Sequence, residues 1–160
     1  MTSQTRDDEY FLLKAIELAT TSAQNNGGPF GAVIVKNNKI IGTGHNQVTQ
    51  SCDPSAHAEI MAIRDACKKI KNYQLTDCII YSSCEPCPMC LSAIYWARIP
   101  KLVYAASAKD AARAGFDDHF IYEELNKPEA QRQLNISQLK HPLLNQSFEV
   151  WNNNKTKTKY

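Results

Sequence analysis

The chain has 160 residues, of which 18 are Lys or Arg and 16 are Asp or Glu, so its formal net charge is +2. This length is typical of one domain, and such a domain buries a core without needing disulfide bonds. The balanced charge gives no electrostatic support for binding a long nucleic acid, and no apolar stretch approaches the ~20 residues of a membrane-spanning helix. The polar N-terminus lacks the apolar core of a signal peptide, so we expect a cytoplasmic protein.

The first part of the chain predicts a helix followed by a β-hairpin. Apolar residues recur at helical spacing over residues 8–22, so one face of this segment should be buried. Residues 30–36 then predict a buried strand, and residues 39–44 predict the strand that returns beside it. Asn37-Asn38 separates the two strands, and Asn tolerates the positive φ angles of a tight turn.

Strands and helices alternate in the middle of the chain. Asp53-Pro54 predicts the start of a helix, because Asp caps free N–H groups and Pro suits the first helical position. Two further strands are predicted at residues 78–82 and 102–105, with a helix between them from about Pro86 to Arg98. Beyond Lys109 the chain turns polar with patches of helical pattern, and composition alone predicts a mobile tail over residues 152–160.

This order of elements predicts a single α/β domain over residues 1–160. Strands that alternate with helices are joined in parallel by right-handed crossovers, whereas the hairpin is antiparallel. We therefore expect three layers, α/β/α, with helices on both faces of a mixed sheet.

Six cysteines need an explanation. Disulfide frameworks suit small secreted chains, whereas Cys84, Cys87 and Cys90 lie close together in a chain without an export signal, which indicates metal or redox chemistry. Cys67 and Cys78 lie in apolar stripes and are expected to be buried thiols.

A metal centre is the stronger interpretation of the cluster. Cys87 and Cys90, spaced by two residues at a predicted helix start, can grip one zinc ion, and His57 can supply a third ligand, which leaves the fourth tetrahedral position open. Glu59 lies two residues after His57 and suits a proton carrier beside the metal. A closed structural zinc site and a redox role for Cys84, which has the same spacing to Cys87, are the alternatives.

The pattern His57-x-Glu59 followed by Pro86-Cys87-x-x-Cys90 is the signature of zinc nucleobase deaminases. The chain resembles the cytidine and nucleobase deaminase superfamily nearly end to end, and within it the small bacterial guanine deaminases. The segments that carry this closer likeness are residues 27–35 (GGPFGAVIV), 53–59 (DPSAHAE), 83–90 (SCEPCPMC), 93–98 (AIYWAR) and 114–118 (AGFDD), together with the terminal Tyr160.

The resemblance implies a cytidine-deaminase-like fold, a role for each matching residue and a homodimer. One Zn²⁺ per chain would be held by His57, Cys87 and Cys90, with Glu59 as general acid and base. In substrate binding, the resemblance implies that Asn46 and the Ala58 backbone hold the purine. Phe30 and Trp96 would form the apolar walls of the pocket. Asp118 would accept hydrogen bonds from donor groups of the ring, and Tyr160 would close the pocket. Without the resemblance, the aromatic residues would be assigned to the core and Tyr160 to a frayed end. In such enzymes a C-terminal segment, here about residues 135–160, can swap between subunits.

The reaction implied is hydrolysis of guanine to xanthine and ammonia in purine catabolism or salvage. The guanine amine is on C2, next to ring N3, so one carboxylate can serve both atoms as acid and base. A tRNA adenosine deaminase shares the zinc motifs, but the modest charge and the acidic pair Asp117-Asp118 speak against a phosphate-rich partner. Guanosine, cytosine and other amino-bearing rings are alternative substrates, and a non-catalytic zinc module would not need Glu59.

Overall fold

The structure is a computed structural model that describes residues 3–160, with side chains from residue 6. The chain divides into two units, which meet between residues 121 and 122 and are described separately. Within the described residues, no helix is long and apolar enough to cross a membrane.

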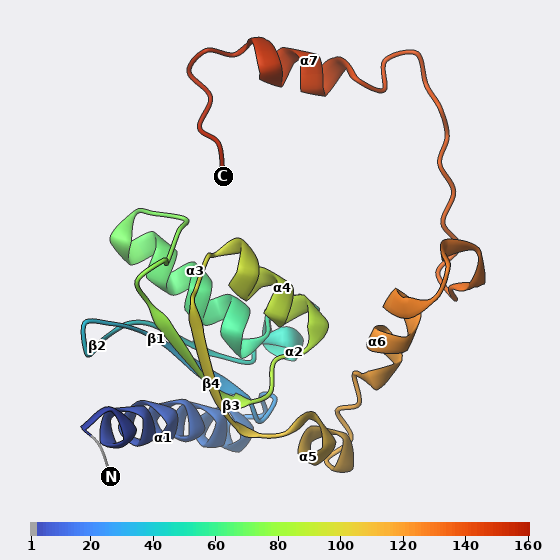
Figure 1. Ribbon diagram of the computed structural model, residues 1–160. Helices are drawn as coiled ribbons and strands as arrows, with labels where there is room; N and C mark the ends of the chain where they lie inside the picture. Colours follow the sequence, from blue (N-terminus) through green and yellow to red (C-terminus); the bar gives the residue numbers. More distant parts are fainter. Residues whose placement is uncertain (1–2) are drawn as a thin grey trace. The chain divides into compact units, whose positions relative to one another are not determined.

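A four-stranded mixed sheet forms the centre of the first unit (Figure 1). Its strands are β1 (Gly31–Lys36), β2 (Lys39–His45), β3 (Ile79–Cys84) and β4 (Lys101–Ala106), in the spatial order β2-β1-β3-β4. Strand β1 pairs antiparallel with both β2 and β3, and β3 pairs parallel with β4. The candidate metal ligands Cys87 and Cys90 follow the carboxyl end of β3, which lies beside the carboxyl end of the parallel strand β4. Ligand sites in α/β sheets are expected at this edge.

Helices cover both faces of this sheet (Figure 1). Helix α1 (Ser3–Gln24) lies on one face, and helices α3 (Ala58–Ile70) and α4 (Pro88–Trp96) lie on the other. Successive residues of β1 point to opposite faces, so Val33 packs with the α1 side and Ile34 with the α3 side. The predicted three-layer α/β/α fold is confirmed.

The hairpin turn is also as predicted, with positive φ angles of 49° at Asn37 and 56° at Asn38. Helix α4 begins at Pro88, and Cys87 is its N-cap. It ends at Trp96, slightly earlier than predicted, and Arg98 adopts a left-handed φ of 59° beyond it.

The predicted start of helix α3 at Asp53 is wrong, because the helix begins at Ala58 with His57 as N-cap. Asp53 instead closes a local turn: its Oδ1 accepts hydrogen bonds from the Ser55 backbone N at 2.8 Å and from Ser55 Oγ at 2.7 Å. Asp competes for nearby backbone donors in this way when the chain is not yet helical. His57 therefore lies at the N-terminus of the helix rather than within its first turns.

Helix α3 packs directly on the backbone of β2. A Cβ atom at Gly44 would lie only 2.1 Å from the Ala58 carbonyl oxygen and 2.4 Å from the Ala62 nitrogen. Only glycine permits this approach. The close contact fixes the first turn of α3, and with it His57 and Glu59, against the sheet.

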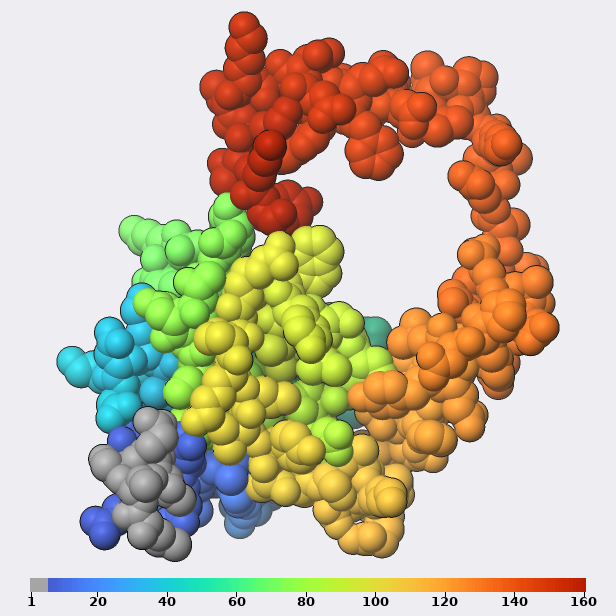
Figure 2. Space-filling model, in the orientation of Figure 1, coloured from blue at the N-terminus to red at the C-terminus, as the bar shows by residue number. Residues whose placement is uncertain are grey.

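The remaining helices are short, and α2 was not expected from the sequence. They are α2 (Val48–Ser51), α5 (Ala108–Arg113), α6 (His119–Asn126), the 3₁₀ helix η1 (Glu129–Gln131) and α7 (Gln146–Asn153). Helix α7 extends into the start of the segment expected to be irregular. In the second unit the side chains lie along an open chain path rather than around a core of their own (Figure 2).

Candidate metal centre and active site

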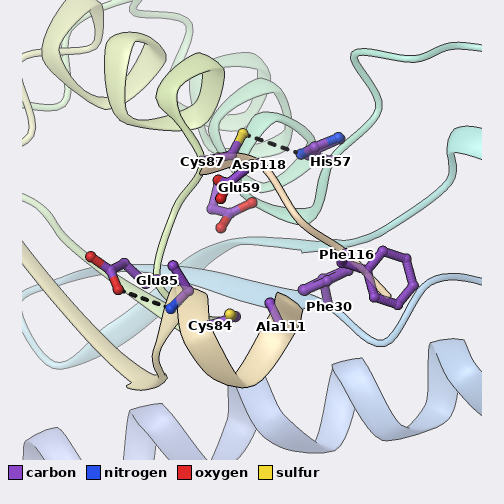
Figure 3. Close-up of a pocket in the computed structure, with 10 residues that line it drawn as sticks. Phe30, His57, Glu59, Cys84, Glu85, Cys87, Ala111, Phe116 and Asp118 are labelled. Carbon is purple, nitrogen blue, oxygen red and sulfur yellow. Dashed lines mark hydrogen bonds between the residues drawn. The ribbon is translucent and has the colours of Figure 1, made fainter. Parts of the chain in front are cut away.

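Three side chains from two helix starts form a compact group of potential metal ligands. Nδ1 of His57 and the sulfurs of Cys87 and Cys90 all lie within 4.8 Å of one another. Nδ1 is 3.6 Å from Cys87 Sγ (Figure 3). It is 3.5 Å from Cys90 Sγ. His57 is the N-cap of α3, Cys87 is the N-cap of α4, and Cys90 lies in the first turn of α4.

This donor set fits zinc. Thiolate sulfur and imidazole nitrogen are preferred zinc ligands, and three protein ligands leave a tetrahedral position open, as in catalytic sites. The pKa of Cys87 is lowered to about 4, because the Cys90 thiol and the His57 ring donate hydrogen bonds to its sulfur. The pKa of Cys90 is raised by that same bond and by burial, and the contact with Cys87 raises the pKa of His57. The group thus already holds one thiolate at neutral pH.

Glu59 lies beside this group with its carboxylate buried. Its side chain is 5% exposed, and Ser82 Oγ donates a hydrogen bond to its Oε1 at 2.9 Å. Burial raises the pKa of Glu59, because a charged carboxylate is poorly solvated there, and the hydrogen bonds only partly oppose this effect. A carboxyl group whose pKa is raised in this way is suited to take up and return a proton.

Glu59 lines a pocket with an empty volume of about 430 Å³, which includes the solvent space at its entrance. The residues that line it are Phe30, His57, Glu59, Cys84, Glu85, Cys87, Ala108, Ala111, Phe116 and Asp118 (Figure 3). Phe30 and Phe116 make an edge-to-face pair with ring centroids 4.9 Å apart, which gives the pocket an apolar wall. Burial and the nearby Cys87 thiolate raise the pKa of Asp118.

The structure brings together most of the residues singled out from the sequence, but not all. Asn46 and Ala58 are buried and do not line the pocket, and the Asn46 side chain accepts a bond from the Val48 nitrogen at 3.3 Å. Trp96 is 63% exposed on α4, where the Arg98 guanidinium lies 5.9 Å from its ring centroid, so it does not line this pocket either. Tyr160 belongs to the second unit, and its ring lies 6.5 Å from that of Trp151.

Phe116 and Glu85 are pocket residues that the sequence did not single out. Both lie within segments that carried the likeness to deaminases, residues 114–118 and 83–90. The likeness could therefore have placed them near the site, but it did not indicate what their side chains do. Cys84, expected as a residue behind the ligands or a labile thiol, lines the pocket, and burial together with the Glu59 charge raises its pKa to about 11.

The family model of the cytidine and deoxycytidylate deaminase zinc-binding region matches residues 5–106 of this chain. The chain belongs to this family of zinc-dependent hydrolases, and the observed group of His57, Cys87 and Cys90 agrees with that membership. Its fold is that of the family.

Individual relatives within this family show which of its members the chain is similar to. The chain is 53% identical to a guanine deaminase of Bacillus subtilis over 95% of this chain and 98% of the relative. The X-ray structure of guanine deaminase from Bacillus subtilis superimposes with a TM-score of 0.92 and 51% identity, covering 100% of this chain and 99% of that one. A tRNA-specific adenosine deaminase of Buchnera aphidicola is 43% identical, but over 75% of this chain and 80% of the relative.

Proposed function

We propose that this protein is a zinc-dependent hydrolase that converts guanine to xanthine and ammonia in purine catabolism or salvage. The observation that carries the proposal is that Glu59 and Asp118 line one pocket together with His57 and Cys87, two of the three potential zinc ligands. The similarity to the Bacillus subtilis guanine deaminase supports it, since that match covers 95% of this chain, whereas the match to the tRNA deaminase covers 75%.

The proposed metal is one Zn²⁺ per chain, held by His57, Cys87 and Cys90. When bound, zinc activates a water molecule as a nucleophile at neutral pH. Glu59 takes a proton from the attacking water and delivers it to ring N3 while the C2–O bond forms. Glu59 then passes the proton of the new hydroxyl group to the exocyclic nitrogen, the C2–N bond breaks, and ammonia leaves. The products contain all the atoms of guanine and one water.

The charges of the pocket suit a neutral ring that is rich in hydrogen-bond donors. Glu59, Glu85 and Asp118 line it, and no Lys or Arg does so among the described residues. We assign Asp118 to the N–H donors at the guanine edge and Phe30 to the ring face, and we assign no contact to Asn46 or Ala58, which do not line the pocket. Such a lining repels phosphates, which argues against a nucleotide or tRNA as the substrate.

We further propose that the protein is a homodimer in which about residues 135–160 pack on the partner, with Tyr160 closing the partner's pocket. This proposal is supported by the second unit, where Phe148 is 66% exposed and Tyr160 is 75% exposed. Exposed apolar side chains in such number favour a protein partner. The cytoplasm is the proposed location, because no disulfide joins any of the six cysteines, as is usual in a reducing compartment.

The test is ammonia release by the zinc-loaded protein from guanine, guanosine, cytosine, adenosine and tRNA. We expect guanine to give by far the highest kcat/KM. Glu59→Gln should keep zinc and lose activity by ~10²–10⁴-fold, the range of general acid–base catalysis. Ammonia release from tRNA alone would contradict the proposal that guanine is the substrate. Substantial turnover by Glu59→Gln would contradict the proposed role of Glu59 as general acid and base.

A further inference from the structure

We infer that Glu85 is a positioning residue that ties the substrate-facing segment of the pocket to the metal-binding loop. This inference rests on the proposed function, which assigns the substrate edge to Asp118. Glu85 follows β3 directly and precedes Cys87 by two residues. Its Oε2 accepts a hydrogen bond from the Ala108 backbone nitrogen, at the start of α5, at 2.9 Å (Figure 3).

Glu85 holds the junction between β4 and α5 from both its backbone and its side chain. Its backbone nitrogen donates to the Ala106 carbonyl oxygen at 2.8 Å, directly beyond the register pair of Cys84 and Ala106. Its carboxylate then reaches the N–H of Ala108, a first-turn donor that has no partner within a helix. The Ser107 N-cap side chain serves Asp110 instead, so it does not replace this contact.

Helix α5 leads directly to the residues that face the substrate. It ends at Arg113, and Gly115, with a φ of +91°, turns the chain toward Phe116 and Asp118. The Phe116 nitrogen donates to the Ala111 carbonyl oxygen at 3.0 Å, which fixes this turn to the helix. The distance between Asp118 and the metal-binding loop is therefore set in part through Glu85.

A carboxylate that lines a pocket could also carry protons or exclude anions, and these roles differ from positioning in what they require. Positioning requires an acceptor oxygen but no charge, so Glu85→Gln should preserve it, whereas Glu85→Ala removes it. A proton carrier or a charge filter would be lost in both variants.

The first experiment needs no turnover and is hydrogen exchange of the zinc-loaded protein followed by mass spectrometry. We expect Glu85→Ala to exchange at least about tenfold faster over residues 106–118, with residues 79–84 unchanged. Glu85→Gln should exchange like the wild type. Equal exchange in the wild type and Glu85→Ala would overturn the inference, whatever the substrate proves to be.

The second experiment is a kinetic cycle with guanine. We expect Glu85→Ala to raise KM about tenfold while kcat changes less than threefold and zinc content stays the same, and Glu85→Gln to restore KM. Because Glu85 acts through Asp118, adding Glu85→Ala to Asp118→Ala should cost clearly less than it costs the wild type. Full additivity, or equal damage from both Glu85 variants, would overturn the inference.

Asp65→Ala is the matched control. Asp65 Oδ2 likewise accepts a hydrogen bond from a backbone nitrogen, that of Thr43 in β2 at 2.9 Å, but Asp65 does not line the pocket. We expect it to lower Tm and leave KM unchanged. A KM increase there equal to that of Glu85→Ala would show a general loss of stability and overturn the inference. A wild type that binds zinc but does not deaminate guanine would refute the proposed function alone, since the exchange experiment still tests the contact.

Discussion

Glu59 and Ser82 form the most buried polar pair near the metal ligands. Ser82 is 2% exposed, and its hydroxyl holds Oε1 of Glu59 at 2.9 Å. We expect Ser82→Ala to lower kcat about tenfold with unchanged zinc content, because the carboxylate loses its one side-chain hydroxyl donor in a site that water reaches poorly. Ammonia release and metal per chain measure this.

The neighbouring serine provides the control. Ser83 Oγ accepts a hydrogen bond from the Gly31 nitrogen at 3.0 Å, on the side of β3 away from Glu59. Ser83→Ala should lower Tm by a few degrees and leave kcat near that of the wild type. Equal kcat losses in the two variants would show that Ser82 acts only through stability.

The cysteines should separate by reactivity when the metal is removed. In the zinc-loaded protein at pH 7 we expect iodoacetamide to modify Cys52, which is exposed, and not Cys84, whose pKa of about 11 keeps it a thiol. A chelator should make Cys87 reactive, since it lines the pocket and its pKa of about 4 keeps it a thiolate once the metal no longer covers the sulfur. Mass spectrometry of the modified peptides measures the order, and modification of Cys84 before Cys87 would contradict it.

Proximity of the two cysteine ligands could be predicted because it depends on local geometry, whereas the approach of His57 to Cys87, across 30 residues of chain, depends on the packing of the fold. Cys87 and Cys90 are three residues apart at a helix start that Pro88 marks, so their sulfurs turn to one side. The aromatic wall could not be predicted in the same way. Which face of α4 is buried depends on the sheet beneath it, and there Ile94 takes the inner side while Trp96 faces outward.

Among the elements, the contact of α3 with β2 fixes the position of Glu59, and this contact can be tested at Gly44. Gly44→Val adds a branched side chain where even a Cβ would meet Ala58 and Ala62 backbone atoms at 2.1 and 2.4 Å. We expect α3 to be displaced, with a loss of about 3 kcal/mol in the free energy of unfolding and weaker zinc binding. Denaturant unfolding and metal titration measure both.

Thr43→Val on the same strand is the control, because Thr43 is exposed and already β-branched. It should change the free energy of unfolding by less than about 0.5 kcal/mol. A Gly44→Val protein as stable as this control would show that α3 adapts without displacement.

The sequence predicted the elements of the first unit well because their signals are local. Hydrophobic runs mark the strands, and the asparagine pair marks the hairpin. The start of α3 was missed because Asp53 is a good cap in isolation but makes a turn with Ser55 here. Helix α2 was missed because four residues without a side-chain cap leave almost no pattern.

At the scale of the whole molecule, the second unit has no core of its own. None of the described residues from 122 to 160 is buried, although the segment carries apolar side chains along α7 and before it. A segment of under ~40 residues rarely buries enough surface to fold alone. Its local pattern predicted helical patches correctly, but sequence periodicity does not identify a surface on which its apolar side chains would pack.

Two inactive variants can reveal whether that surface belongs to a second copy. In the proposed dimer, Glu59→Gln spoils the site of its own chain, whereas deletion of the last residues through Tyr160 spoils the site of the partner. A mixed dimer then has one intact site, formed by Glu59 of the truncated chain and the tail of the Glu59→Gln chain. After joint unfolding and refolding at equal amounts, half of the dimers should be mixed, so we expect about a quarter of wild-type ammonia release. Each variant refolded alone should stay inactive. If the tail instead closes the pocket of its own chain, no mixture regains activity, and light scattering would show whether a dimer forms at all.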